Sequence, residues 1–147
     1  MVQFLRFLGP LTMRSITIDI KAQFYDLDPM QVVWHGNYAR YFEEARCALL
    51  DRIGYNYPQM QESGYMWPIV DMRIKYVRPL RFAQEATVTA TIVEYENRLK
   101  IDYLIADKTT GEALTKATTT QVAVLISTGE LCLESPAALL DKMRDSA

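Results

Sequence analysis

The sequence has few of the residues that build metal centres and disulfide frameworks. Its 147 residues include two cysteines and a single histidine. Cys47 and Cys132 lie far apart in the chain, and neither belongs to a CxxC pair. This spacing argues against a cysteine-based zinc site and against a disulfide framework. We therefore expect no metal and no other cofactor, and we expect the protein to act in a reducing compartment, the cytoplasm.

The sequence also lacks a surplus of positive charge and a long hydrophobic run. The formal net charge is -2, whereas nucleic-acid binding usually requires clustered Lys and Arg. No apolar stretch approaches the roughly 20 residues of a membrane-spanning helix. Residues 1–13 are mildly apolar but have neither the longer run nor the cleavage site of a signal peptide. We expect no nucleic-acid partner, no membrane span, and a loose tail at residues 1–13, with Met13 a candidate for the natural start.

Repeats and linkers rich in Gly, Pro or Ser are absent, which favours a single domain over residues 1–147. Residues 15–23 alternate between apolar and polar, which predicts a strand with one buried face. From Asn37 to Ile53 apolar residues recur with the i, i+3, i+4 spacing of an amphipathic helix, which Gly54 is suited to end. Further strands are predicted over residues 66–77, 85–95, 98–106, 113–126 and 131–133, and a closing helix over residues 137–144. Short turns require antiparallel neighbours, so one long helix on one curved antiparallel sheet, an α+β architecture, is expected.

The unusual residues of the chain gather in the loop before this helix. Residues 24–36 contain two acids, Asp26 and Asp28, and the only histidine, His35. The first backbone N–H groups of a helix lack partners, and the helix dipole is positive there. A negative charge that develops during a reaction could therefore be stabilised at this point.

The stretch from Asp26 to Arg46 resembles the signature of the small hot-dog acyl-CoA thioesterases. It reads DLDPMQVVWHGNYARYFEEAR. The family includes 4-hydroxybenzoyl-CoA thioesterase and the thioesterases associated with the Tol-Pal system. The resemblance implies the hot-dog fold, a curved antiparallel sheet wrapped around one long central helix. It also implies homodimers, often paired into homotetramers, with sites near the subunit boundary.

The resemblance assigns two catalytic positions. Asp28 matches the carboxylate that attacks the thioester carbonyl or activates a water to do so. His35 matches the position whose backbone N–H polarises the thioester oxygen. The chemistry is consistent, because a fixed N–H at a helix start can stabilise an oxyanion and coenzyme A thiolate is a good leaving group. The expected reaction is hydrolysis of an acyl-CoA thioester to the free acid and coenzyme A.

Other residues of this region are weaker candidates. Trp34, Gln31 and Trp67 are expected to bind the substrate, and Asn37 and Glu43 are expected to support the site. Large aromatic side chains more often serve packing, and a helical Glu is often only a solvated residue. The family often has Gly or Ala-Gly where this chain has Met30 and Gln31. Larger side chains there could narrow the pocket, or Gln31 could hold a water.

Several of these residues could instead have a purely structural role. Asp28 could simply cap a turn, because Asp-Pro is a frequent turn pair, and Asp26 is expected to make a structural hydrogen bond in the loop. The basic residues near the end of one strand could meet the phosphates of coenzyme A or form a solvated face. They are Arg73, Lys75, Arg78 and Arg81.

Two other functions stay open. One is a thioesterase that acts on acyl carrier protein, and the other is a non-catalytic hot-dog protein that binds acyl-CoA. Exposed sheet edges need cover, which favours at least a dimer for any of the three.

Overall fold

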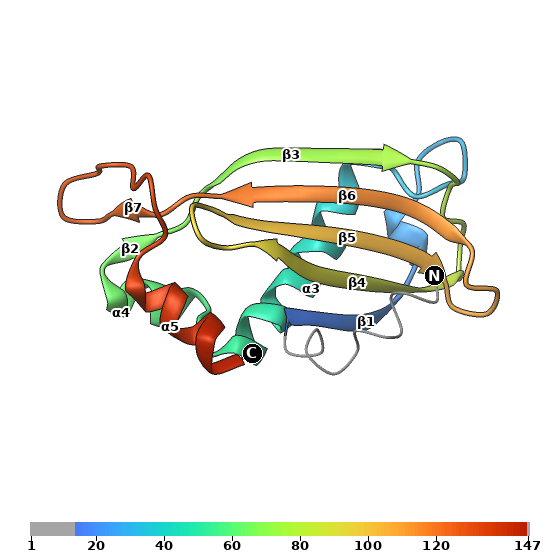
Figure 1. Cartoon of the computed structure of the whole chain (residues 1–147). Coiled ribbons are helices and arrows are strands. Elements are labelled where there is room, and N and C mark those ends of the chain that lie inside the picture. The colour runs from blue at the N-terminus through green and yellow to red at the C-terminus, as the bar shows by residue number, and fades with distance from the viewer. Residues whose placement is uncertain (1–13, 147) are drawn as a thin grey trace.

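The structure is a computed structural model that describes residues 14–146. The expected tail at residues 1–13 lies outside this range. Five strands form one antiparallel sheet in the order β1-β4-β5-β6-β3 (Figure 1). Their bounds are Ser15–Lys21 for β1, Ile69–Tyr76 for β3, Glu85–Glu94 for β4, Leu99–Asp107 for β5 and Ala113–Gln121 for β6.

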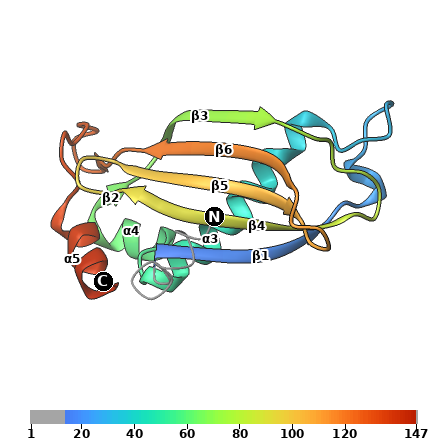
Figure 2. The ribbon, with the colours of Figure 1, turned by 45° about the vertical axis from the view of Figure 1, so that its right-hand side comes forward.

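One long helix, α3, spans Tyr38–Ile53 and lies along one face of this sheet (Figures 1 and 2). It packs against β1 and β4. This arrangement confirms the predicted α+β class and the hot-dog fold. Two shorter helices lie at one end of the sheet, α4 over Tyr57–Ser63 and α5 over Ala137–Ser146. The remaining elements are η2 (Phe24–Asp26), η3 (His35–Asn37) and a small sheet of β2 (Tyr65–Met66) and β7 (Val124–Leu125).

The periodicity of the sequence accounts for the packing of these elements. On β4, alternate residues such as Val88 and Ala90 are fully buried, while Thr89 lies between them on the other face. On α3, the face that includes Phe42 and Leu49 is buried against the sheet. The helix ends at Gly54, whose φ of 75° is the left-handed conformation that glycine adopts without strain.

Three predicted strands differ from the structure. The strand expected over residues 66–77 is interrupted at residues 67–68, between β2 and β3. The strand expected over residues 113–126 ends at Gln121 and resumes only as the two residues of β7. The strand expected over residues 131–133 is an isolated bridge between Leu131 and Val124. The expectations for residues 113–126 and 131–133 rest on the β-branched and apolar residues of these segments. Such composition does not show whether a neighbouring strand is available for pairing.

The two edges of the main sheet are β1 and β3. On β3 every residue except Ile74 is exposed, including the apolar Val70 and Met72. Within residues 14–146, no helix is long and apolar enough to cross a bilayer.

Candidate active site

Asp28 begins a tight turn between two short extended segments. Leu27 and Val33 form an antiparallel bridge across it. The Asp28 N–H donates to the Val32 carbonyl at 2.9 Å, and the Gln31 N–H donates to the Asp28 carbonyl at 2.8 Å. Gln31 closes the turn with a φ of 64°. The turn therefore fixes the backbone of Asp28 from both sides.

The Asp28 side chain is oriented by the same turn. Its Oδ1 accepts a hydrogen bond of 2.8 Å from the Met30 N–H and a longer one of 3.5 Å from the Val32 N–H. Among residues 14–146, Oδ2 has no hydrogen-bond or ion-pair partner. One carboxylate oxygen of Asp28 therefore caps the turn, as a purely structural role would require, and the other carboxylate oxygen stays free to react.

Asp26 has the structural role expected of it. Its side chain is buried, and Oδ2 accepts hydrogen bonds from the Gln23 N–H at 2.8 Å and the Tyr41 hydroxyl at 3.3 Å. Its carbonyl accepts from the Trp34 N–H at 2.9 Å and from the Asn37 side-chain amide at 2.8 Å. Asp26 and Asn37 together hold the chain where it enters the helix.

His35 is the first residue of η3, which runs directly into α3. Its N–H finds no hydrogen-bond acceptor in the part of the chain that the structure describes. Its carbonyl accepts a hydrogen bond of 2.8 Å from the Tyr76 hydroxyl. The imidazole packs beside Trp34 and Tyr76, with ring centroids 5.2 and 6.5 Å away. The free N–H at a helix start is the feature that the resemblance implies for this position.

Asp28 and His35 line the same pocket, which has a volume of about 230 Å³. Its wall is mainly apolar and comes from the Asp28 turn, the start of α3 and the end of β3. Burial raises the pKa of Tyr38 in this wall, and the negative charge of Asp28 adds to the increase. The other lining residues are Met30, Val32, Val33, Tyr76, Val77, Arg78 and Pro79.

The predicted substrate-binding residues do not line this pocket. Trp67 is 5% exposed and belongs to the core, where its Nε1–H donates to the Tyr55 hydroxyl at 3.1 Å. Trp34 is half-exposed and its ring lies against Gly36. The side chain of Gln31 is exposed. The expectation that Trp67 contacts the acyl group rests on its aromatic ring, but in the structure this ring packs edge-to-face with Tyr55.

Glu43 also lies apart from the pocket. It forms an ion pair with Arg46, one turn further along α3, and accepts a hydrogen bond of 2.9 Å from the Tyr57 hydroxyl. It makes no hydrogen bond to the loop before the helix within residues 14–146. The expected support of the site by Glu43 therefore differs from the contacts observed, which link α3 to α4.

The sequence did not predict that Tyr76, at the end of β3, lines the pocket, whereas Arg78 is one of the basic residues that could meet the phosphates of coenzyme A. Tyr76 and Arg78 lie far from Asp28 in the sequence, and no motif connects them. The segments meet because Val32 forms a bridge with Arg81 and the Val33 N–H donates to the Leu80 carbonyl at 2.9 Å. Pro79 indicates in the sequence that the strand ends near residue 78, but nothing in the sequence indicates which segment pairs with residues 80 and 81.

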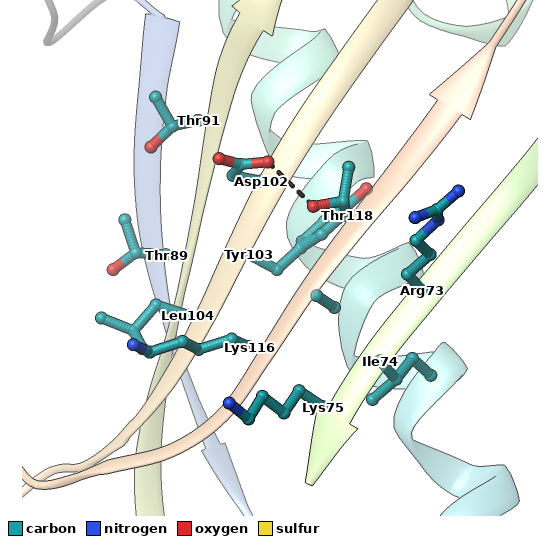
Figure 3. A pocket seen from close by; sticks show the side chains of 11 residues that line it. Arg73, Ile74, Lys75, Thr89, Thr91, Asp102, Tyr103, Leu104, Lys116 and Thr118 are labelled. Carbon is teal, nitrogen blue, oxygen red and sulfur yellow. Dashed lines mark hydrogen bonds between the residues drawn. The ribbon is translucent and has the colours of Figure 1, made fainter. Parts of the chain in front are cut away.

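A larger groove, of about 820 Å³, lies on the sheet face opposite α3 (Figure 3). Its acid, Asp102, accepts a hydrogen bond of 3.0 Å from Thr118. Lys75 and Lys116 stand opposite each other on neighbouring strands at its floor. The four basic residues near the end of the strand are thus divided, because Arg73 and Lys75 line this groove, Arg78 lines the small pocket and Arg81 lines neither. The groove does not contain the acid and amide pair.

Comparison with known proteins gives the family. The model of the thioesterase-like superfamily matches residues 22–143. The chain belongs to the thioesterase-like superfamily. This assignment confirms the resemblance seen in the sequence and makes the protein a thioester hydrolase.

Two proteins similar to this chain have names that mention different carriers. A Bacillus subtilis protein named "Putative acyl-CoA thioesterase YneP" is 30% identical over 72% of this chain and 77% of its own length. The Arabidopsis thaliana chloroplastic acyl-acyl carrier protein thioesterase ATL3 is 32% identical over 51% of this chain and 40% of its own length.

Solved thioesterase structures have the same fold. A DHNA-CoA thioesterase from Staphylococcus aureus superposes with a TM-score of 0.73 at 26% identity, covering 81% of this chain and 80% of its own. A 4-hydroxybenzoyl-CoA thioesterase bound to 4-hydroxybenzoyl-CoA superposes with a TM-score of 0.76 at 22% identity, covering 88% of this chain and 99% of its own.

Proposed function

We propose that this thioesterase hydrolyses an acyl-CoA thioester to the free acid and coenzyme A, with Asp28 and the His35 N–H as its reacting groups. The observation that carries the proposal is that both residues line one pocket. The carboxylate has a free oxygen and the amide has a free N–H, as described above. A nucleophile or base and an oxyanion donor are the two groups that acyl transfer requires.

The reaction runs through attack on the thioester carbonyl. Asp28 either attacks the carbon itself, giving an anhydride that water then hydrolyses, or removes a proton from an attacking water. In both routes the carbonyl oxygen gains negative charge, which the His35 N–H stabilises. One well-placed donor of this kind is worth about 3–4 kcal/mol. The carbon–sulfur bond then breaks and the electron pair leaves with coenzyme A as its thiolate.

The wall of the pocket suits the acyl group. Met30, Val32 and Val77 present apolar surface, and Tyr38 and Tyr76 add aromatic rings. Acyl groups bind such surfaces through the hydrophobic effect. Arg78 lies at the same pocket with its side chain 61% exposed and paired to Glu112. Its charge is placed to attract a phosphate-bearing carrier.

Acyl carrier protein is the second candidate carrier. The likeness to a chloroplastic acyl carrier protein thioesterase favours it. The chemistry at Asp28 and His35 is the same for both carriers, because each presents a thioester on a pantetheine arm. Rates measured with one acyl group on coenzyme A and on acyl carrier protein decide between them.

The test is thiol release from a panel of acyl-CoAs by the purified protein, read with a thiol-detecting dye. We expect hydrolysis of at least one member and a loss of at least about 100-fold in kcat for Asp28→Asn, because a positioned base typically contributes roughly 10²–10⁴-fold. Asn accepts the same turn hydrogen bond from Met30, so the fold is retained. The matched control is Asp71→Asn, an exposed acid of β3 that pairs with Arg73, and it keeps the wild-type rate.

Two outcomes contradict the proposal. One is the absence of thiol release above background with every acyl-CoA and every acyl carrier protein thioester tested. The other is full activity of Asp28→Asn. Binding of an acyl-CoA without turnover would instead favour the non-catalytic alternative.

A further inference from the structure

A tyrosine from the edge of the sheet holds the backbone of His35. Tyr76 is the last residue of β3, and its hydroxyl donates the hydrogen bond of 2.8 Å to the His35 carbonyl across 41 positions of sequence. The end of β3 lies beside the segment that leads into α3 in both views (Figures 1 and 2). This bond therefore ties the start of the helix to the sheet.

The other anchors of this segment hold the residues on either side of His35. The Trp34 N–H donates to the Asp26 carbonyl at 2.9 Å, and the Asn37 side-chain amide donates to the same carbonyl at 2.8 Å. The Asn37 N–H also donates to the Trp34 carbonyl at 2.9 Å, which holds the peptide plane that carries the His35 N–H. None of these three bonds reaches the next peptide, which joins His35 to Gly36. Among the described residues, Tyr76 is the side chain that hydrogen-bonds to the backbone of His35.

The direction of an N–H group depends on how the rest of its residue is held. The His35 N–H lies in the Trp34–His35 peptide plane and the His35 carbonyl lies in the next plane, and the two planes rotate against each other only about the two backbone bonds of the His35 α-carbon. The bond from Tyr76 holds the second plane while Asn37 holds the first, so together they fix the direction of the N–H. The Tyr76 ring is itself restrained, because it packs edge-to-face on Tyr38 with centroids 4.9 Å apart. An oxyanion donor is effective only when its direction is set before the reaction. The tether supplies such pre-organisation.

We propose that Tyr76 is a positioning residue, which aims the His35 N–H at the thioester oxygen through its hydrogen bond to the His35 carbonyl. The inference rests on the proposed function, in which that N–H stabilises the oxyanion. Tyr76 also lines the pocket, so the competing role is direct contact with the acyl group. Positioning affects the transition state and changes kcat, whereas uniform binding of the acyl group changes KM.

The kinetic test is Tyr76→Phe, which keeps the ring packed on Tyr38 and removes only the hydroxyl. We expect kcat to fall about tenfold, because small displacements of a reacting group are costly, with KM within about twofold of the wild type. The matched control is Tyr57→Phe. Tyr57 and Tyr76 are both 46% exposed, and the Tyr57 hydroxyl donates at 2.9 Å to Glu43, away from the pocket. This control keeps the wild-type kcat, while an unchanged kcat or a raised KM in Tyr76→Phe overturns the inference.

A second test does not depend on turnover. In ¹⁵N-labelled protein, Tyr76→Phe is expected to shift the amide resonances of His35 and Gly36, because the peptide between them loses its hydrogen bond, whereas Tyr57→Phe leaves them unchanged. Unchanged resonances in Tyr76→Phe overturn the inference. If the wild type hydrolysed no thioester, the proposed function would fail, yet this measurement would still show whether Tyr76 orients the peptide.

Discussion

At the scale of single residues, Gln31 departs from the family pattern at a position where the backbone is strained. Its φ of 64° is left-handed, which costs a residue other than glycine roughly 1–2 kcal/mol. The family often has a small residue at this point of the turn, and glycine adopts the conformation without strain. The Gln31 side chain is exposed and lies outside the pocket lining, whereas Met30 lines the pocket. Gln31 therefore affects backbone strain, and Met30 shapes the pocket.

Replacing Gln31 by glycine is expected to stabilise the protein. Relief of the left-handed strain outweighs the added flexibility of the unfolded chain, so the free energy of unfolding rises by about 0.5–1 kcal/mol in urea denaturation. Gln23→Gly is the control, because Gln23 is an exposed glutamine just before this loop with a φ of -95°, and its side chain donates only a long hydrogen bond of 3.3 Å to the Lys21 carbonyl. Its free energy of unfolding falls by a similar amount. Equal destabilisation by both substitutions would contradict this account.

At the scale of elements, β3 is an edge strand that is mostly exposed in a single chain. It pairs with β6 on one side, and its other edge is unpaired among the described residues. Its apolar side chains Val70, Met72 and Tyr76 are 57%, 44% and 46% exposed. The helix α3 packs on β1 and β4, at the opposite side of the sheet. An exposed apolar edge favours pairing with another strand, so we propose that a second copy covers β3.

The protein is therefore expected to form at least a dimer at micromolar concentration, as measured by light scattering coupled to size-exclusion chromatography. Met72→Glu places a charge on the uncovered strand and is expected to give a monomer, because an unpaired charge is costly to bury. Val93→Glu is the matched control: Val93 is 49% exposed on β4, and this variant stays oligomeric. A monomeric wild type would rule out the proposed pairing, and the choice between dimer and tetramer stays a prediction.

At the scale of the whole molecule, the space between sheet and helix contains several tyrosines. Burial raises the pKa of Tyr38, Tyr41 and Tyr103, and the negative charge of Asp26 adds to the increase at Tyr41. Each of these hydroxyls makes a hydrogen bond, as Tyr103 does with Thr119 at 2.8 Å. The folded state therefore binds the protons of these tyrosine hydroxyls more strongly than the unfolded state does.

These tyrosines predict the behaviour of the protein at high pH. A tyrosine of the unfolded chain loses its proton near pH 10, while the buried hydroxyls retain theirs. Above this pH the unfolded state binds fewer protons than the folded state. The free energy of unfolding therefore keeps the full contribution of these tyrosines below about pH 10 and falls as the pH rises further. Urea denaturation between pH 8 and 11 measures this fall, and Tyr103→Phe is expected to make it shallower. A free energy that stays constant to pH 11 would contradict the prediction.

The sequence alone determined the main elements and placed the two proposed reacting residues on one loop. Periods of two residues and of i, i+3, i+4 are local, and they were sufficient for the main strands, the long helix and its end at Gly54. The stretch from Asp26 to Arg46 placed Asp28 and His35 together because both lie on one short loop that enters one helix. Such expectations depend only on residues that are close in the sequence. In the structure, Asp28 and His35 line the same pocket.

Only the tertiary structure decided which distant residues line the pocket. Tyr76 and Arg78 reach the pocket because the end of β3 lies beside the Asp28 turn. Trp67 does not reach it, because the chain around α4 brings this indole into contact with Tyr55 instead. A local pattern shows which face of an element is buried, but it does not show which other element covers that face. Hence the walls of the pocket and the tether on His35 could be seen only in the folded chain.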